Sequence, residues 1–349
     1  MELADELDRL GHRNRLVALS PALDGGHEPG LVPLVTSRRV GPLELVTLAW
    51  RLRRLLADEP ADVVLAHGGW AAEVAALAAP RDGSLLVWQH TLGVHDKIWG
   101  PVRQRWWRSI VRRFDVGVAL TDGMAVELHR LGFRGPVWII PNFRKPDRFL
   151  DLDRSVAAAR LRAEAGVPTD VPLIGFVGYL VHQKRPERAI EVLALLRADG
   201  CPAHLAMAGD GPLRADLEAQ ADLLGVAEAV AFLGHRADVE SVLGGVDLIL
   251  LTSEAEGIPG VAIEALMAGC PVVTVAVGGV TEVVEHGVTG LVVEGDEPAP
   301  MAEAVAGLLD DEETRAAMSR NGRLSIDRFS AAATAAVYAE RLTAARAGR

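Results

Sequence analysis

Ser253–Gly290 reads SEAEGIPGVAIEALMAGCPVVTVAVGGVTEVVEHGVTG, and this stretch decides the fold. It holds two glutamates, Glu256 and Glu264, with seven residues between them, and a Gly-Gly pair follows. One apolar run, Leu248–Thr252, leads into the stretch and another, Val272–Val275, lies inside it. Short runs of Val, Leu and Ile that alternate with helical patterns are typical of parallel sheets buried on both faces.

The same alternation continues outward in both directions. The expected strands of the first half are Arg15–Ser20, Val63–His67, Leu85–Gln89, Val116–Thr121 and Val137–Ile140. Those of the second half are Leu173–Val177, His204–Ala208, Val230–Leu233, Leu248–Thr252, Val272–Val275 and Gly290–Val293. This pattern predicts an α/β protein with two Rossmann-like, doubly wound parallel-sheet domains.

Length and charge also indicate two domains. The 349 residues exceed one typical core. Pro and charged residues interrupt both periodicities in Pro141–Arg154, so we expect an N-terminal domain over 1–148 and a C-terminal domain over 149–325. Residues 1–170 carry 23 Lys and Arg against 21 Asp and Glu, whereas residues 171–349 carry 13 against 26. The acidic half argues against a nucleic-acid partner, because phosphate backbones require clustered cations.

The beginning of the chain departs from the doubly wound pattern. Leu3, Leu7 and Leu10 recur at helical spacing, and Gly11 follows as a stop signal. We therefore expect that the first strand of the N-terminal domain and its Gly-rich loop are missing. We also expect that the true start lies roughly 20–30 residues upstream. Translation of the DNA before Met1 would test this, because an immediate in-frame stop would contradict it.

Location and metal content are constrained by what the sequence lacks. It has no apolar run long enough to span a bilayer and no signal-peptide core. Cys201 and Cys270 have no metal-ligand spacing, which fits a reducing cytoplasm. The histidines are scattered, so a structural metal is not expected. Asp151-Leu152-Asp153 has the form of a metal-binding DxD, but it lies in the linker and we discount it.

The chemistry of the opening stretch follows from its position. Ligands of open parallel sheets bind at the carboxyl ends of strands. Glu256 lies on the loop after Leu248–Thr252, and Glu264 lies in the expected helix Val261–Ala268. A carboxylate can accept hydrogen bonds from both hydroxyls of a sugar diol. Gly278-Gly279 precedes another expected helix, whose free N–H groups attract phosphate. The alternative is that both glutamates are ordinary solvated acids.

Taken together, these patterns resemble a family-4 glycosyltransferase of the GT-B type over nearly the whole chain. The motifs are EGIPGVAIEALMAGCPVV, GGVTEVVEHGVTGLVV, GDGP at Gly209–Pro212, FLGHRADV at Phe232–Val239 and IPN at Ile140–Asn142. The resemblance implies a GT-B fold whose two Rossmann-like domains face a cleft. It also implies that a final helix over 326–349 crosses back to the N-terminal domain.

The resemblance also implies a donor site in the second half. Glu256 would contact the transferred sugar, Glu264 the nucleotide ribose, and Lys184 the diphosphate. The expected donor-binding residues are Gly178, Tyr179, Lys184, Arg185, Gly209, Glu256, Gly257, Ile258, Pro259, Glu264, Gly278 and Gly279. The family usually has an arginine at the position of Tyr179, and we hypothesise that Arg185 supplies the missing positive charge. A solvated loop lysine is the alternative for Lys184.

In the first half, three residues at strand ends are candidates. His90 matches a histidine that faces the donor sugar in related enzymes, so the expected catalytic residues are Glu256, Lys184 and His90. His67 and Asp122 are candidates for the acceptor side. Each has an alternative: a structural histidine at a strand end for His90, a structural role for His67, and a helix N-cap for Asp122.

The segment Trp99–Phe114 interleaves arginines with tryptophans, which suits an anionic membrane surface. The alternative is a solvated helix whose tryptophans pack in the core. Liposome flotation would distinguish the two.

The leading hypothesis is a retaining glycosyltransferase that moves a hexose from a nucleotide diphosphate sugar, UDP- or GDP-linked, to a hydroxyl acceptor, lipid-linked or a glycan. Neither a metal ion nor another cofactor is expected to take part. The expected location is the cytoplasm or the inner face of the membrane. The alternatives are a sugar-nucleotide epimerase or hydrolase of the same fold, and a non-catalytic or truncated sugar-nucleotide-binding protein.

Overall fold

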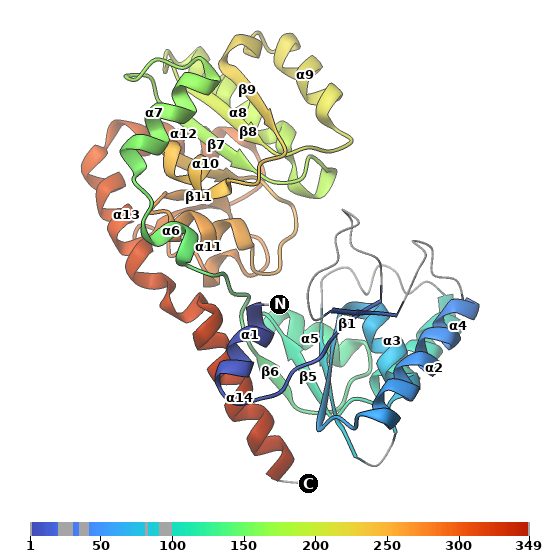
Figure 1. The fold of residues 1–349 in the computed structure, drawn as a ribbon. Helices are drawn as coiled ribbons and strands as arrows, with labels where there is room; N and C mark the ends of the chain where they lie inside the picture. Colours follow the sequence, from blue (N-terminus) through green and yellow to red (C-terminus); the bar gives the residue numbers. More distant parts are fainter. Residues whose placement is uncertain (1, 20–30, 35–41, 81–82, 91–99, 348–349) are drawn as a thin grey trace. The chain divides into compact units, whose positions relative to one another are not determined.

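The computed structural model describes residues 2–19, 31–34, 42–80, 83–90 and 100–347. They form two compact units (Figure 1). The first unit comprises Met1–Pro141 together with Ala331–Arg349, and the second comprises Asn142–Ser330. The two ends of the chain therefore belong to the same unit, and the second unit is an insertion between them.

The second unit is built on a six-stranded parallel sheet in the order β12-β11-β10-β7-β8-β9. Its strands are β7 (Leu173–Val177), β8 (His204–Ala208), β9 (Val230–Gly234), β10 (Leu248–Leu251), β11 (Val272–Val275) and β12 (Gly290–Val293). The strand order reverses between β7 and β10, which lie side by side in the middle of the sheet. In doubly wound sheets, this switch point is where ligands bind.

Helices and short 3-10 turns surround this sheet. They are α6 (Asp147–Leu150), α7 (Arg154–Ala165), η2 (His182–Lys184), α8 (Pro186–Ala198), α9 (Arg214–Leu223), η3 (Ala227–Ala229), α10 (Val239–Gly245), α11 (Gly260–Met267), η4 (Val280–Glu282), α12 (Pro298–Asp310), α13 (Glu312–Ser325) and η5 (Ile326–Phe329). Leu173, Leu205 and Leu248 are fully buried under them. All-apolar strands are possible here because helices cover both faces of the sheet.

The discounted DxD has a structural role. Asp153 is the N-cap of α7, and its carboxylate accepts hydrogen bonds from the backbone N–H groups of Ser155 and Val156. The hydrogen bond from the Ser155 hydroxyl, followed by these backbone bonds, lowers the pKa of Asp153. N-capping thus accounts for this aspartate.

The first unit contains a four-stranded parallel sheet in the order β3-β4-β5-β6 and a separate parallel pair, β1-β2. The strands are β1 (Leu16–Ala18), β2 (Leu31–Pro33), β3 (Val63–His67), β4 (Leu85–Gln89), β5 (Val116–Ala119) and β6 (Val137–Ile139). The helices are α1 (Glu2–Arg9), α2 (Pro42–Asp58), α3 (Gly68–Ala78), α4 (Gly100–Val111), α5 (Asp122–Arg130) and α14 (Ala331–Ala347). The last helix, α14, packs against α1 (Figure 1).

The fold prediction is confirmed: the protein is α/β, with parallel sheets in both units. Each expected strand is present, although the one expected over Val116–Thr121 ends at Ala119. Thr121 instead caps α5, because its hydroxyl accepts the backbone N–H of Met124. The strand β2 was not expected, since it is only three residues long and ends on a proline.

Candidate active site

Lys184 and Glu256 meet at the carboxyl ends of β7 and β10. The Lys184 ammonium lies 2.6 Å from Glu256 Oε1, and the Ser253 hydroxyl donates to the same oxygen at 2.6 Å. Glu256 is 8% exposed, so its charge is largely removed from water and depends on these two partners. The structure therefore joins two of the three expected catalytic residues, although 72 positions separate them in sequence.

The two loops that carry this pair are fastened to each other. The backbone N–H of Glu254 donates to the carbonyl of Gln183, and the Gln183 side chain donates to the carbonyl of Ala255, both at 3.0 Å. The Thr252 hydroxyl donates to the carbonyl of Lys184 at 2.9 Å. These bonds fix the loop after β7 against the loop after β10.

Glycines let neighbouring loops approach closely. Gly278 has φ of 52°, and a Cβ there would lie 1.7 Å from the carbonyl oxygen of Glu256. The next residue, Gly279, donates its N–H to the carbonyl of Gly257 at 2.7 Å. Gly209 has φ of 150°, and a Cβ there would lie 1.8 Å from the carbonyl oxygen of Gly178. Within the predicted donor set, Gly279 therefore contacts Gly257, and Gly209 contacts Gly178.

The helix expected after Gly279 is only one 3-10 turn, η4. A single turn has too few aligned peptides to add a helix dipole, so an anion near Gly278 could gain only individual N–H contacts. The start of α11 is more regular. Pro259 is its N-cap, and Ile258 before it is buried.

Glu264 lies in α11, where it is paired with an arginine that the sequence did not single out. Arg144 Nε donates to Glu264 Oε1 at 2.5 Å. Arg144 belongs to the segment that follows β6, 120 positions before Glu264. No periodicity or motif could connect residues at that separation.

Tyr179 and Arg185, which lie on the same loop after β7 as Lys184, differ in their surroundings. Tyr179 is 61% exposed and has no cationic character. Arg185 has φ of 48° and is the N-cap of α8. Its guanidinium is paired with Glu187, Nε to Oε1 at 2.8 Å, and with Glu254, Nη1 to Oε2 at 3.7 Å. The positive charge of Arg185 is therefore partly balanced by two carboxylates.

In the first unit, His90 is buried at the end of β4. Its side chain is fully excluded from solvent, and Nε2 lies 2.9 Å from Glu127 Oε2. Its other ring nitrogen, Nδ1, has no hydrogen-bond partner among the described residues. A buried polar nitrogen without a hydrogen-bond partner is costly to the folded state.

The other two candidates of this unit lie at helix starts. His67 ends β3 and precedes α3, but its side chain makes no capping hydrogen bond. Although His67 is exposed as a residue, neighbouring atoms desolvate its imidazole and lower its pKa. Asp122 is the first residue of α5 and is exposed. The N-cap alternative for Asp122 was wrong by one position, because Thr121 is the cap.

The arginine-rich helix α4 divides its two described tryptophans between the core and the surface. Trp107 is buried against Trp88, with ring centroids 5.6 Å apart. Trp106 is partly exposed and donates its indole N–H to Glu73 Oε1 at 3.0 Å. Arg105, Arg108 and Arg112 are exposed, and Trp99 lies outside the described residues. The core-packing alternative is therefore right for Trp107, and the membrane-surface interpretation of this segment stays a prediction.

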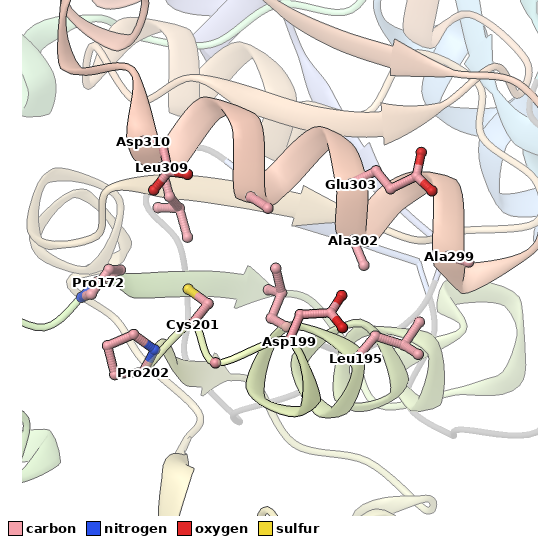
Figure 2. Close-up of a pocket in the computed structure, with 13 residues that line it drawn as sticks. Pro172, Leu195, Asp199, Cys201, Pro202, Ala299, Ala302, Glu303, Leu309 and Asp310 are labelled. Atoms are coloured by element: carbon pink, nitrogen blue, oxygen red, sulfur yellow. The ribbon is translucent and has the colours of Figure 1, made fainter.

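A cavity of about 510 Å³ lies between α8 and α12 (Figure 2). Pro172, Cys201 and Pro202 line it near the amino ends of β7 and β8. The candidate residues follow the carboxyl ends of the strands, and none of them lines this cavity.

The described part of the chain contains no group of three His, Cys, Asp or Glu residues that could hold a metal ion. Among its helices, none combines the length and apolar character needed to cross a bilayer.

Comparison with known proteins agrees with this architecture. Residues 1–148 match the model for "Glycosyltransferase Family 4", and residues 158–325 match that for "Glycosyl transferases group 1". Alpha-D-kanosaminyltransferase of Streptomyces kanamyceticus is 31% identical over 67% of this chain and 61% of that relative. The 2-deoxystreptamine glucosyltransferase of the same organism is 30% identical over 76% of this chain and 72% of the relative.

The solved structure of Anabaena Alr3699/HepE in complex with UDP superimposes with a TM-score of 0.83. It is 22% identical, and the match covers 98% of this chain and 96% of that one. The four-stranded and six-stranded parallel sheets, together with this structural match, show the GT-B fold. The chain belongs to glycosyltransferase family 4.

Proposed function

We propose that the chain is a retaining glycosyltransferase that moves a hexose from a nucleotide diphosphate sugar to a hydroxyl acceptor. The observation that carries the proposal is the contact of Lys184, Ser253 and Glu256 at the switch point of the six-stranded sheet. Gly278 lies against the backbone of Glu256, which leaves the site without a side chain at that position. The Lys184 ammonium suits the diphosphate of a nucleotide-sugar donor, and the Glu256 carboxylate suits the hydroxyls of its sugar. The backbone at Gly278, which has no side chain, leaves room for the donor.

The roles follow from charge. As the glycosidic bond breaks, negative charge develops on the leaving diphosphate, and the Lys184 ammonium would stabilise it. Glu256 would accept hydrogen bonds from the sugar and Glu264 from the ribose. The leaving diphosphate would help to remove the acceptor proton on the same face of the sugar, so neither a protein nucleophile nor a metal ion or other cofactor is needed. His90 would assist from the first unit, with His67 and Asp122 on the acceptor side.

The names of the relatives support a sugar donor, since they are called kanosaminyl- and glucosyltransferase. The structural neighbour binds UDP, which supports a nucleotide diphosphate. A thermal-shift screen across UDP-, GDP-, ADP- and dTDP-sugars tests the proposal. A donor present at 100 times its Kd should stabilise the protein by about 2.7 kcal/mol. If no nucleotide sugar stabilises it, the proposal fails.

A second candidate is a protein that binds a nucleotide sugar without transferring it. The exposed Tyr179 and the balanced charge of Arg185 favour it, since both reduce the positive charge around the leaving group. Transfer of labelled sugar from the donor found in the screen to a hydroxyl acceptor decides between the two. Donor binding without any labelled product over a broad set of acceptors would support the second candidate.

The hypothesis that Arg185 replaces the usual arginine gives a mutational prediction. We expect Arg185→Ala to lower kcat about tenfold to a hundredfold if its guanidinium leaves Glu187 and Glu254 to contact the diphosphate. Glu187→Gln is the matched control, because it removes one competing carboxylate and should not lower kcat. Steady-state kinetics measures both, and unchanged turnover of Arg185→Ala would remove the idea.

We also propose that the protein works in the cytoplasm, at the inner face of the membrane, with α4 as its contact. Its exposed arginines suit anionic lipid, and each can contribute about 1 kcal/mol near such a surface. We expect Arg105→Glu with Arg108→Glu to reduce binding to anionic vesicles at least tenfold in flotation. Substituting Arg53 and Arg54, exposed on α2, is the control for general charge. Wild-type protein that does not float would refute this contact.

A further inference from the structure

Arg144 is held in place by its backbone. Its N–H donates to the carbonyl of Phe329 at 2.9 Å, and it forms a parallel bridge with Ser330. Phe329 is the last residue of η5, which packs against α11. The Arg144 side chain therefore begins from a fixed point beside the helix that carries Glu264.

The guanidinium occupies the space that a side chain at Gly260 would fill. A Cβ on Gly260 would lie 1.6 Å from Arg144 Nη2. Gly260 does not have a positive φ, so its backbone does not require glycine and the lack of a side chain serves the arginine. Gly260 and Glu264 are four residues apart in α11 and lie on the same face of it.

From this position Arg144 contacts one side of the Glu264 carboxylate. Its Nε donates to Oε1 at 2.5 Å, while Nη1 donates to the carbonyl of Phe143 at 2.8 Å. Oε2 of Glu264 has no hydrogen-bond partner within the part of the chain that the structure describes. Both side chains are partly exposed, at 33% for Arg144 and 22% for Glu264, so a ligand can reach them.

We propose that Arg144 is a positioning residue for nucleotide binding. It holds Glu264 Oε1 and thereby presents Oε2 to the two ribose hydroxyls of the nucleotide. The inference rests on the proposed function, in which Glu264 binds the ribose, and adds a residue outside the predicted site. An exposed ion pair that served only stability would contribute little and would not distinguish one nucleotide from another.

The test compares nucleotides with and without the ribose diol. Isothermal titration measures Kd of UDP and GDP, and of their 2′,3′-dideoxy counterparts, for the full chain and its variants. We expect Arg144→Met to raise Kd of the ribonucleotide that binds about threefold to tenfold, and to leave that of the dideoxy form unchanged. In a Glu264→Gln background, Arg144→Met should have no further effect.

Gly260→Ala provides an independent variant, since its methyl group displaces the guanidinium without removing it. It should raise Kd as much as Arg144→Met, and the two changes together should be no worse than either alone. Equal Kd of the wild type and both variants, or an equal loss with the dideoxy form, would overturn the inference and leave the proposed function standing. If the wild type binds neither UDP nor GDP, the proposed function falls and the inference falls with it.

Discussion

We expect Lys184→Met to lower kcat/KM for the donor by about a hundredfold to a thousandfold. Methionine keeps the length of the side chain but removes the ammonium, which lies 2.6 Å from Glu256 Oε1. The diphosphate would then leave without a cation beside it, and a lost contact to developing negative charge typically has an effect of this size. Initial rates with the donor identified by thermal shift measure the effect.

Lys184→Arg is the matched control and should retain more activity than Lys184→Met, because it keeps the positive charge. Stability must be measured beside activity, since Lys184→Met leaves the mostly buried Glu256 without its cationic partner. Adding Glu256→Gln should recover stability without recovering activity. A kcat/KM of Lys184→Met equal to that of the wild type would refute the assigned role.

We expect Gly278→Ala to abolish detectable donor binding. Its methyl group would lie 1.7 Å from the carbonyl oxygen of Glu256, so the loops after β10 and β11 must separate. That movement would also break the bond from the Gly279 N–H to the Gly257 carbonyl. Titration with the donor measures the loss, and circular dichroism confirms that the variant is folded.

Gly287→Ala separates this clash from backbone strain. Gly287 also has a positive φ, 77°, but nothing lies within 4 Å of a Cβ built on it. Both variants should lose about 1–2 kcal/mol from the unfavourable backbone conformation, and only Gly278→Ala should also lose donor binding. Equal donor affinity of the two variants would contradict the close approach of these loops.

The sequence predicts the architecture because buried strands have to be apolar on both faces. Six strands, β3, β4, β7, β8, β11 and β12, have the expected bounds. Shorter elements depend on tertiary contacts. The three residues of β2 form a strand only because β1 pairs with them, and local sequence does not reveal such pairing.

The contact of Lys184 with Glu256 could be predicted from the order of the strands in the sheet. Lys184 and Glu256 follow strands that are neighbours in the sheet, and carboxyl ends of parallel strands share one edge. The contact of Arg144 with Glu264 was not predictable, since it depends on where Phe329 fixes the backbone. Ser253 was also missed as a partner of Glu256, because serine at a strand end is common.

The hydrogen bonds between Gln183 and the loop at Glu254 and Ala255 have a thermodynamic consequence for ligand recognition. A site whose loops are already braced does not pay the entropy of ordering them when a ligand arrives. Discrimination among donors then depends mainly on residence time, because the rate of encounter varies little among similar ligands. A wrong sugar would enter this site almost as fast as the right one and would be rejected by leaving sooner.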